Sequence, residues 1–180
     1  MGAMDSETSH TVAWQSPGAW QQVTLFFSSL ISGENAPDLS IARQVARGIL
    51  ADYETLEERL DVLAARVCPD CRDNCCARAV IGYDFPDLLF QSLVYGDLPP
   101  AQMTKVQDPQ AGRICACLSP TGCRLPRARR PFVCTWYLCP PMKALDTKGD
   151  LAATVEGIKK ARKRMEAELY AVLSGKPVIY

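Results

Sequence analysis

The sequence CPDCRDNCC, residues 68–76, is the stretch around which the rest of the chain is organised. It brings four thiols together, and five more cysteines follow at positions 115, 117, 123, 134 and 139, so all nine cysteines of the protein lie in one middle segment. A cysteine placed by chance behaves as a small buried hydrophobic residue, whereas sulfurs this close in sequence compete for a metal or for a disulfide. The pattern therefore predicts an irregular, sulfur-rich centre.

The composition predicts one domain in the cytoplasm. The chain has 180 residues and is 48% hydrophobic, which suffices for one ordinary core. Its 20 basic and 20 acidic residues cancel, so no overall field attracts nucleic acid or an anionic membrane. No apolar run approaches the roughly 18 residues of a membrane span, and no signal-peptide pattern opens the chain. We expect a cytoplasmic protein that binds neither membrane nor nucleic acid, and we leave a protein partner open.

The start of the chain differs from the remainder. Residues 1–15 are small and polar without periodicity, and we expect a disordered tail there. One helical domain should follow over residues 16–180, with its metal-binding core at residues 68–139. The only histidine, His10, falls in the tail, which leaves sulfur as the main metal donor expected.

The fold class indicated is mainly α, a helical bundle around the irregular cysteine-rich segment, because apolar residues recur at steps of three and four and strand-like alternation is scarce. Helices are expected over residues 16–33, 35–67, 84–96 and 150–175. Asn35 with Asp38, and Asp84 with Asp87, have the spacing of capping boxes. The residues expected on the inner faces of the first, second and last helices are Val23, Phe26, Phe27, Leu30, Ile31, Ile41, Val45, Ile49, Tyr53, Leu56, Leu60, Leu63, Val67, Leu151, Val155, Ile158, Met165, Leu169 and Val172.

Three groups of charged residues favour plain structural interpretations. The acidic residues at 52, 54, 57, 58 and 61 lie mostly off the apolar stripe of their helix, which is typical of a solvated face. The arginines at 124, 127, 129 and 130 are near the cysteines in sequence, so they could offset the charge of bound thiolates or simply be solvated. The basic run at 159–164 is interleaved with glutamates and is more typical of a solvated face than of a nucleic-acid groove.

The cysteines leave two metals open. Four thiolates can hold tetrahedral zinc or a [4Fe–4S] cluster, and nine cysteines could serve two sites with one left over. A zinc ribbon would show two C-x2-C pairs, whereas Cys68 and Cys71 form the one pair here, and the first group also departs from the bacterial ferredoxin run. A disulfide scaffold is disfavoured because the cytosol is reducing and nine is odd. An iron–sulfur cluster is the leading expectation, and zinc is the alternative.

The motifs give no basis for naming a reaction. The chain lacks G-x-G-x-x-G, a P-loop and H-E-x-x-H, so dinucleotide, phosphate and zincin chemistry find no support. Without a histidine after the tail, a Cys–His nucleophile pair is also excluded. Whether the protein is an enzyme therefore stays open.

The order of the cysteines resembles one family. The first run, followed by Cys115-x-x-Leu118, Gly122-Cys123, Arg130-Pro131-x-x-Cys134 and Cys139, resembles the zinc- or iron-chelating CxxCxxCC cysteine-cluster family. The match spans residues 68–139. The resemblance implies that the metal ligands are Cys68, Cys71, Cys75, Cys76, Cys115, Cys123, Cys134 and Cys139. Cys117 falls where the family pattern usually has an apolar residue, which makes it the spare thiol.

The expected function is thus thiolate binding of an iron–sulfur cluster or zinc, in a binding or electron-transfer role. Some larger proteins of the family resemble flagellin lysine N-methylases, which implies a first alternative, a cluster-dependent protein-modifying enzyme of methyltransferase type. A second alternative is an interaction module in which zinc is structural and the basic last helix docks a protein partner.

Overall fold

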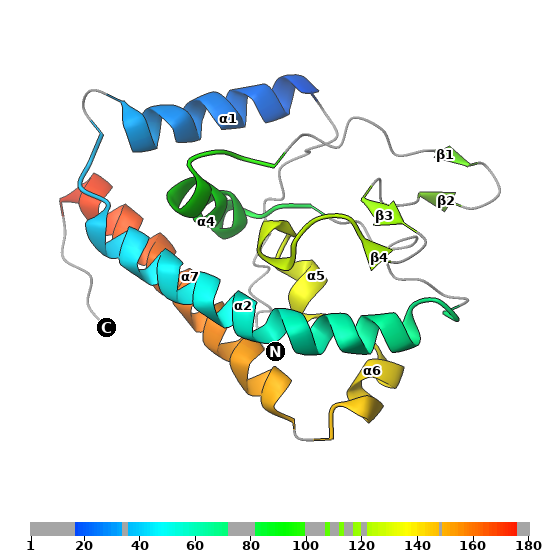
Figure 1. Ribbon diagram of the computed structural model, residues 1–180. Coiled ribbons are helices and arrows are strands. Elements are labelled where there is room, and N and C mark those ends of the chain that lie inside the picture. The colour runs from blue at the N-terminus through cyan, green and yellow to red at the C-terminus, as the bar shows by residue number, and fades with distance from the viewer. Residues whose placement is uncertain are drawn as a thin grey trace, which may run out of the picture.

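The computed structural model describes residues 17–33, 36–71, 82–99, 107–108, 112–113, 117–119, 122–147 and 149–175. The fold is mainly helical, as expected (Figure 1). Within these ranges the helices are α1 (Pro17–Ser32), α2 (Ser40–Val67), α4 (Phe85–Tyr95), α5 (Val133–Trp136), α6 (Pro140–Leu145) and α7 (Asp150–Ser174), with a 3-10 turn, η1, at Arg127–Arg129.

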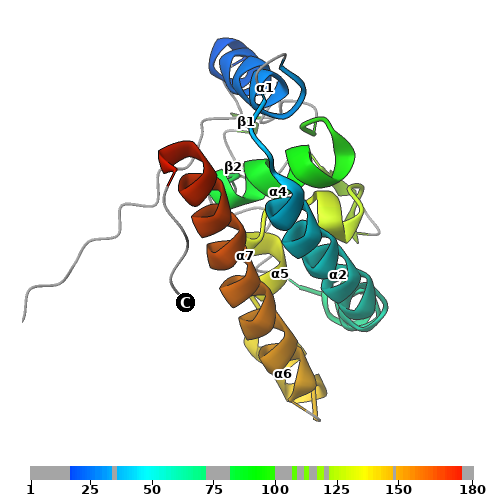
Figure 2. The ribbon, with the colours of Figure 1, turned by 90° about the vertical axis from the view of Figure 1, so that its left-hand side faces the viewer.

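The two long helices, α2 and α7, lie against each other more extensively than any other described pair of elements (Figures 1 and 2). Their facing stripes are apolar at helical spacing, and α4 closes the core from one side with Leu88, Leu89 and Phe90. The fully buried side chains that α2 and α7 supply to this core include Ile49, Tyr53, Leu56, Leu60, Leu151 and Ile158. Packing of these helices, rather than their intrinsic propensity, therefore stabilises the scaffold.

Helix α4 begins and ends at residues that the sequence marks. The Oδ1 atom of Asp84 accepts the N–H of Asp87 at 2.8 Å, and Asp87 Oδ2 accepts the N–H of Asp84 at 3.2 Å, so the predicted capping box is confirmed. Gly96 ends the helix with φ of 74°, in the left-handed region that a glycine adopts without a Cβ clash. Pro69 likewise stops α2 two residues beyond Val67.

The cysteine-rich centre consists of short elements. Strands β1 (Gln107–Asp108) and β2 (Gly112–Arg113) form one antiparallel pair, and β3 (Leu118–Ser119) and β4 (Gly122–Cys123) form another. In the view of Figure 1 the β3–β4 pair lies to the right of α5 and above the C-terminal part of α2, and η1 contacts α2. Among the described residues of 112–139, where the second group of cysteines lies, only short elements occur, in keeping with the irregular centre expected.

Helix α2 starts later than predicted. The expected helix at residue 35 begins at Ser40 instead, and Asn35 lies outside the described residues. The side chain of Asp38 accepts the N–H of Ser40 at 2.9 Å, which also lowers the pKa of this carboxyl. Such a local side-chain bond to the backbone competes with helix formation, so residues 36–39 stay non-helical.

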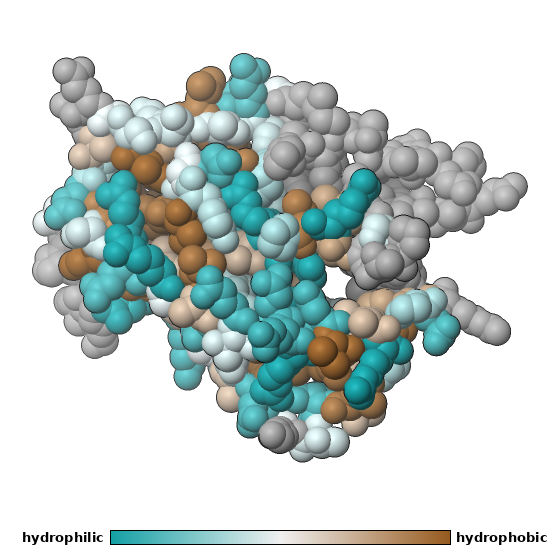
Figure 3. Space-filling model, in the orientation of Figure 1, coloured by the Kyte–Doolittle hydropathy of each residue, from teal (hydrophilic) through white to brown (hydrophobic). Residues whose placement is uncertain are grey.

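Three residues expected on inner faces are exposed. Ile41 is 51% exposed, Phe26 is 53% exposed and Val172 is 40% exposed. Each stands near a helix end or on a helix with a broad apolar stripe, where residues one position apart are hard to assign to a face from periodicity alone. In the view of Figure 3 the surface along α2 is largely hydrophilic, with hydrophobic residues emerging between α1 and α2 and beside α6.

Candidate metal centre and its supporting network

The first two cysteines lie where α2 ends. Cys68 is the C-cap of the helix, and its N–H donates to the C=O of Ala64 at 2.8 Å. The N–H of Cys71 then donates to the C=O of Cys68 at 3.2 Å, which closes a turn through Pro69 and Asp70. Both cysteines are half-buried. The turn brings two sulfur-bearing residues to one end of a rigid helix.

The next described pair lies in the β3–β4 hairpin. Cys123 pairs with Leu118 in the ladder, and the N–H of Arg124 donates to the C=O of Cys117 at 2.8 Å. Cys117, the expected spare, and Cys123, an expected ligand, are therefore close neighbours on opposite arms of one hairpin. Both are half-buried.

The last two cysteines begin short helical turns. Cys134 lies in α5, where its N–H donates to the C=O of Pro131 at 2.9 Å. Cys139 is the N-cap residue of α6, and its C=O accepts the N–H of Lys143 at 2.9 Å. A turn this short has no stability of its own, so its position depends on the contacts around it.

The eight predicted ligands divide between described and undescribed parts of the chain. Cys75, Cys76 and Cys115 lie outside the described residues. Among the residues that are described, no three His, Cys, Asp or Glu side chains are grouped so that they could hold a metal ion. The described residues present six half-buried cysteines, two at the C-terminal end of α2 and four on the β3–β4 hairpin and the turns of α5 and α6. The chemistry of this donor set, thiolates without histidine, fits zinc or an iron–sulfur cluster.

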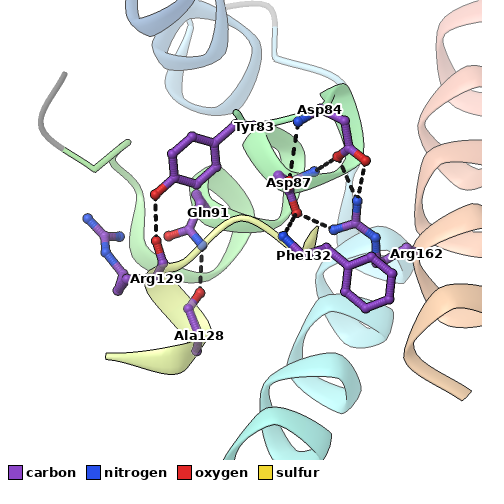
Figure 4. A network of polar contacts seen from close by, with 8 residues as sticks. All are labelled: Tyr83, Asp84, Asp87, Gln91, Ala128, Arg129, Phe132 and Arg162. Atoms are coloured by element: carbon purple, nitrogen blue, oxygen red, sulfur yellow. Dashed lines mark hydrogen bonds and ion pairs between the residues drawn. The ribbon is translucent and has the colours of Figure 1, made fainter. Parts of the chain in front are cut away.

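Side chains from other elements hold residues 127–134, the segment that ends at Cys134. We call it the clamped segment. The N–H of Arg127 donates to Glu57 Oε1 of α2 at 2.9 Å. The side-chain amide of Gln91, on α4, donates to the C=O of Ala128 at 2.6 Å (Figure 4). Side chains thus satisfy backbone groups that a buried loop would otherwise leave without partners.

An acidic and basic network fastens the other end of this segment (Figure 4). The buried carboxylate of Asp87 accepts the N–H of Phe132 at 3.0 Å and also the Nη1 of Arg162. The Nη2 of Arg162 donates to both carboxylate oxygens of Asp84, at 2.6 and 2.7 Å. The guanidinium also lies 4.4 Å from the ring centroid of Phe132. One arginine of α7 therefore binds both capping carboxylates of α4 and the residue that precedes α5.

Burial and the paired charges act against each other in this network. It raises the pKa of the Asp87 carboxyl to about 7; Arg162 acts in the opposite direction, and the neighbouring Asp84 adds to the increase. For Arg162, burial acts to lower the pKa of the guanidinium, but the charges of Asp87, Asp84 and Tyr53 and the hydrogen bond to Asp84 together raise it. Burial, followed by the charge of Asp87, raises the pKa of the Tyr53 phenol well above its usual value.

Tyr83 links this network to the cysteines. Its hydroxyl donates to the C=O of Arg129 at 2.6 Å, within the clamped segment (Figure 4). Burial raises the pKa of its phenol, and the negative charges of Asp87, Cys134 and Cys117 raise it further. Cys134 and Cys117, from two different elements, are thus within electrostatic reach of the same buried hydroxyl.

The structure adds ion-pair partners to the charged groups. Asp61 binds Arg127 at 2.5 Å and lies 3.8 Å from Arg130, although its own side chain remains 47% exposed, as a solvated face requires. Arg129 binds Asp97 at 2.8 Å. These arginines therefore have carboxylate partners in the structure, and compensation of thiolate charge stays a prediction.

The basic residues of α7 also differ from one another in exposure. Lys159, Lys160 and Lys163 are exposed, as a solvated face requires, but the side chain of Arg162 is only 5% exposed. The sequence held a signal for this, because Arg162 falls on the apolar stripe between Ile158 and Met165. An ionic residue on such a stripe is normally paired when it is buried.

Comparisons with family models, with curated proteins and with solved structures found no match to this chain. Among the described helices, none combines the length and the apolar character needed to cross a membrane.

Proposed function

We propose that this chain is a cytoplasmic, cysteine-rich metal-binding protein that holds an iron–sulfur cluster or zinc through thiolates and acts in binding or electron transfer. The observation that carries the proposal is the confinement of all nine cysteines to residues 68–139, in a segment without histidine. The resemblance of the cysteine order to the CxxCxxCC family supports it. The ligands proposed are Cys68, Cys71, Cys75, Cys76, Cys115, Cys123, Cys134 and Cys139.

The scaffold offers physical support for this role. The six described cysteines are half-buried, so a bound metal would be shielded from water while still reachable. They stand at the end of α2, on the β3–β4 hairpin and on the short helices α5 and α6, of which α5 contacts α7 and α6 contacts α2. Ligands held by a rigid scaffold reach a metal with less loss of conformational entropy than ligands on free loops.

The donor set favours the two metals named over others. Thiolates are soft ligands that select zinc or iron–sulfur clusters over magnesium or calcium, which prefer oxygen. A bound [4Fe–4S] cluster would supply one-electron chemistry, whereas zinc would supply folding free energy. The iron–sulfur cluster is the preferred occupant in the proposal, and zinc is the alternative.

The test is metal analysis of the protein purified without oxygen. Visible absorption, iron, zinc and acid-labile sulfide are measured on the same sample, and the control is the same protein after exhaustive chelation. Iron with sulfide and a brown colour supports the cluster, and zinc in a colourless sample supports the alternative. A protein with neither metal, with all its thiols titratable, overturns the proposed function.

A further inference from the structure

We propose that Asp87 and Arg162 are positioning residues for Cys134, and that they fix the α5 turn so that its thiol is presented to a metal. The inference rests on the proposed metal-binding function and goes beyond it, because it assigns a role to two residues that carry no sulfur and lie far from the cysteines in sequence.

The first step is the contact between Asp87 and the clamped segment. Phe132 is the N-cap residue of α5, and its backbone N–H donates to Asp87 Oδ1 at 3.0 Å. Cys134 follows two residues later in the same turn. A buried N–H without an acceptor is costly, so the carboxylate determines where the start of this turn can lie.

The second step is that Asp87 is itself held by hydrogen bonds from three elements. Its two oxygens accept from three donors, the N–H groups of Asp84 and Phe132 and the guanidinium of Arg162. Its side chain is 5% exposed, and the capping box holds it to the first turn of α4. A carboxylate held from three directions transmits the position of the helices to the backbone that it binds.

The third step is that Arg162 also holds Phe132, through its ring. The guanidinium lies over the Phe132 ring at 4.4 Å from its centroid while it binds Asp84 and Asp87. The planar fork of an arginine suits this double task, whereas a lysine would supply a point charge without the stacking surface. Arg162 therefore adds α7 to the elements that fix Phe132.

Hydrogen bonds extend from Phe132 to Cys134 itself. The C=O of Phe132 accepts the N–H of Thr135 at 2.8 Å, so that Phe132 and the residue after Cys134 belong to one turn. The C=O of Cys134 lies 3.5 Å from Arg127 Nη1, whose guanidinium is held by Asp61 of α2. Outer partners that orient a metal ligand typically change metal affinity about 10- to 100-fold when they are removed.

Cobalt tests this directly, because thiolate ligands give Co²⁺ strong charge-transfer absorption that reports how many of them bind. The metal-free full-length chain is titrated with Co²⁺ without oxygen as wild type, Asp87→Ala, Asp87→Asn and Arg162→Lys. We expect Asp87→Ala and Arg162→Lys to lower Co²⁺ affinity about 10- to 100-fold and to weaken the charge-transfer absorption. Asp87→Asn keeps an oxygen that can accept from Phe132, and it should recover most of the signal.

The control separates positioning from general destabilisation. Leu169→Ala removes a fully buried side chain on the same helix, two turns beyond Arg162, and should lower thermal stability without changing the cobalt spectrum. If Asp87→Ala does not fold, Arg162→Lys and Asp87→Asn carry the comparison.

The outcomes are distinguishable. Wild type without thiolate–cobalt absorption, and without iron or zinc as purified, overturns the proposed function and this inference together. If wild type holds iron and sulfide but gives no cobalt absorption, the same variants are compared by their iron and sulfide content, and equal content in all of them overturns the inference alone. Wild type with that absorption, but with variants that match it within about twofold in affinity, overturns the inference alone. Equal loss of the cobalt spectrum in Leu169→Ala would also overturn it.

Discussion

The guanidinium of Arg127 lies 2.5 Å from the carboxylate of Asp61, and this ion pair ties the start of the clamped segment to α2. The two partners differ in exposure, because the side chain of Arg127 is 4% exposed whereas that of Asp61 is 47% exposed. Burial is also the main reason why the pKa of the Arg127 guanidinium is lowered, and the hydrogen bond to Asp61 opposes that change. Loss of the ion pair should therefore destabilise the buried charge of Arg127 more than the exposed charge of Asp61.

Removal of Asp61 should consequently cost more than removal of the whole pair. We expect Asp61→Ala to lower the free energy of unfolding by about 2 kcal/mol, because a buried charge loses its main partner. The double variant Asp61→Ala with Arg127→Met should recover at least half of this loss. Urea unfolding of the two single variants and the double variant gives the coupling free energy.

An exposed pair on the same segment provides the control. Arg129 binds Asp97, whose side chain is 68% exposed, so Asp97→Ala should change the free energy of unfolding by less than about 1 kcal/mol. Strictly additive effects in the Asp61 and Arg127 cycle, or an equal cost for Asp97→Ala, would contradict this account.

Local signals in the sequence predicted the helix boundaries well where the capping residues and the apolar stripe indicate the same start and end. The Asp84 and Asp87 spacing located the start of α4, and Gly96 located its end, because both depend on backbone geometry within a few residues. The start of α2 was wrong because Asp38 bonds to Ser40 locally, a competing option that spacing alone does not exclude.

The partners of the clamped segment could not be predicted in the same way. Glu57, Gln91 and Asp87 reach the segment from helices that are 37 to 70 residues away in sequence. Contacts at such separations depend on how the helices pack, which no local pattern encodes. The cysteine pattern, in contrast, predicts the kind of metal from donor chemistry alone, and it stays a prediction.

The pH dependence of stability should reveal Asp87. Its pKa is about 7 in the folded protein against 3.8 as the usual value, so the unfolded chain releases this proton at lower pH. This stabilising effect is complete below about pH 4 and is lost as pH rises towards 7. The free energy of unfolding should therefore fall by at most about 1.4 kcal/mol per pH unit from Asp87 in that window and be level above it.

The comparison of wild type with Asp87→Asn isolates the contribution of Asp87 to the pH dependence of stability. Urea unfolding at several pH values between 5 and 8, on proteins of matched metal content, should show a shallower slope for Asp87→Asn. Asp97→Asn, at an exposed position, should keep the wild-type slope. Parallel curves for wild type and Asp87→Asn would show that Arg162 holds the carboxylate ionised throughout this range.

Two glycines should respond to alanine in opposite directions. Gly48 lies inside α2 with no atom within 4 Å of an added Cβ, so Gly48→Ala should stabilise the protein by roughly 0.5–1 kcal/mol. Gly96 has φ of +74°, and Gly96→Ala should destabilise it by about 1 kcal/mol although space is open there too. Thermal unfolding measures the stability of both variants. A shift of the same sign in the two would contradict the helical position of Gly48 or the left-handed position of Gly96.

The β3–β4 hairpin offers a matched pair for the ligand assignment. Cys117 and Cys123 are half-buried neighbours on its two arms, yet the family resemblance makes Cys123 a ligand and Cys117 the spare. Cys117→Ser should therefore retain the metal, whereas Cys123→Ser should lose most of it and unfold at lower temperature, since structural metal binding contributes to folding free energy. Cys68→Ser and Cys71→Ser should behave like Cys123→Ser. Metal analysis with thermal unfolding decides the assignment, and equal loss of metal in Cys117→Ser and Cys123→Ser would make Cys117 a ligand.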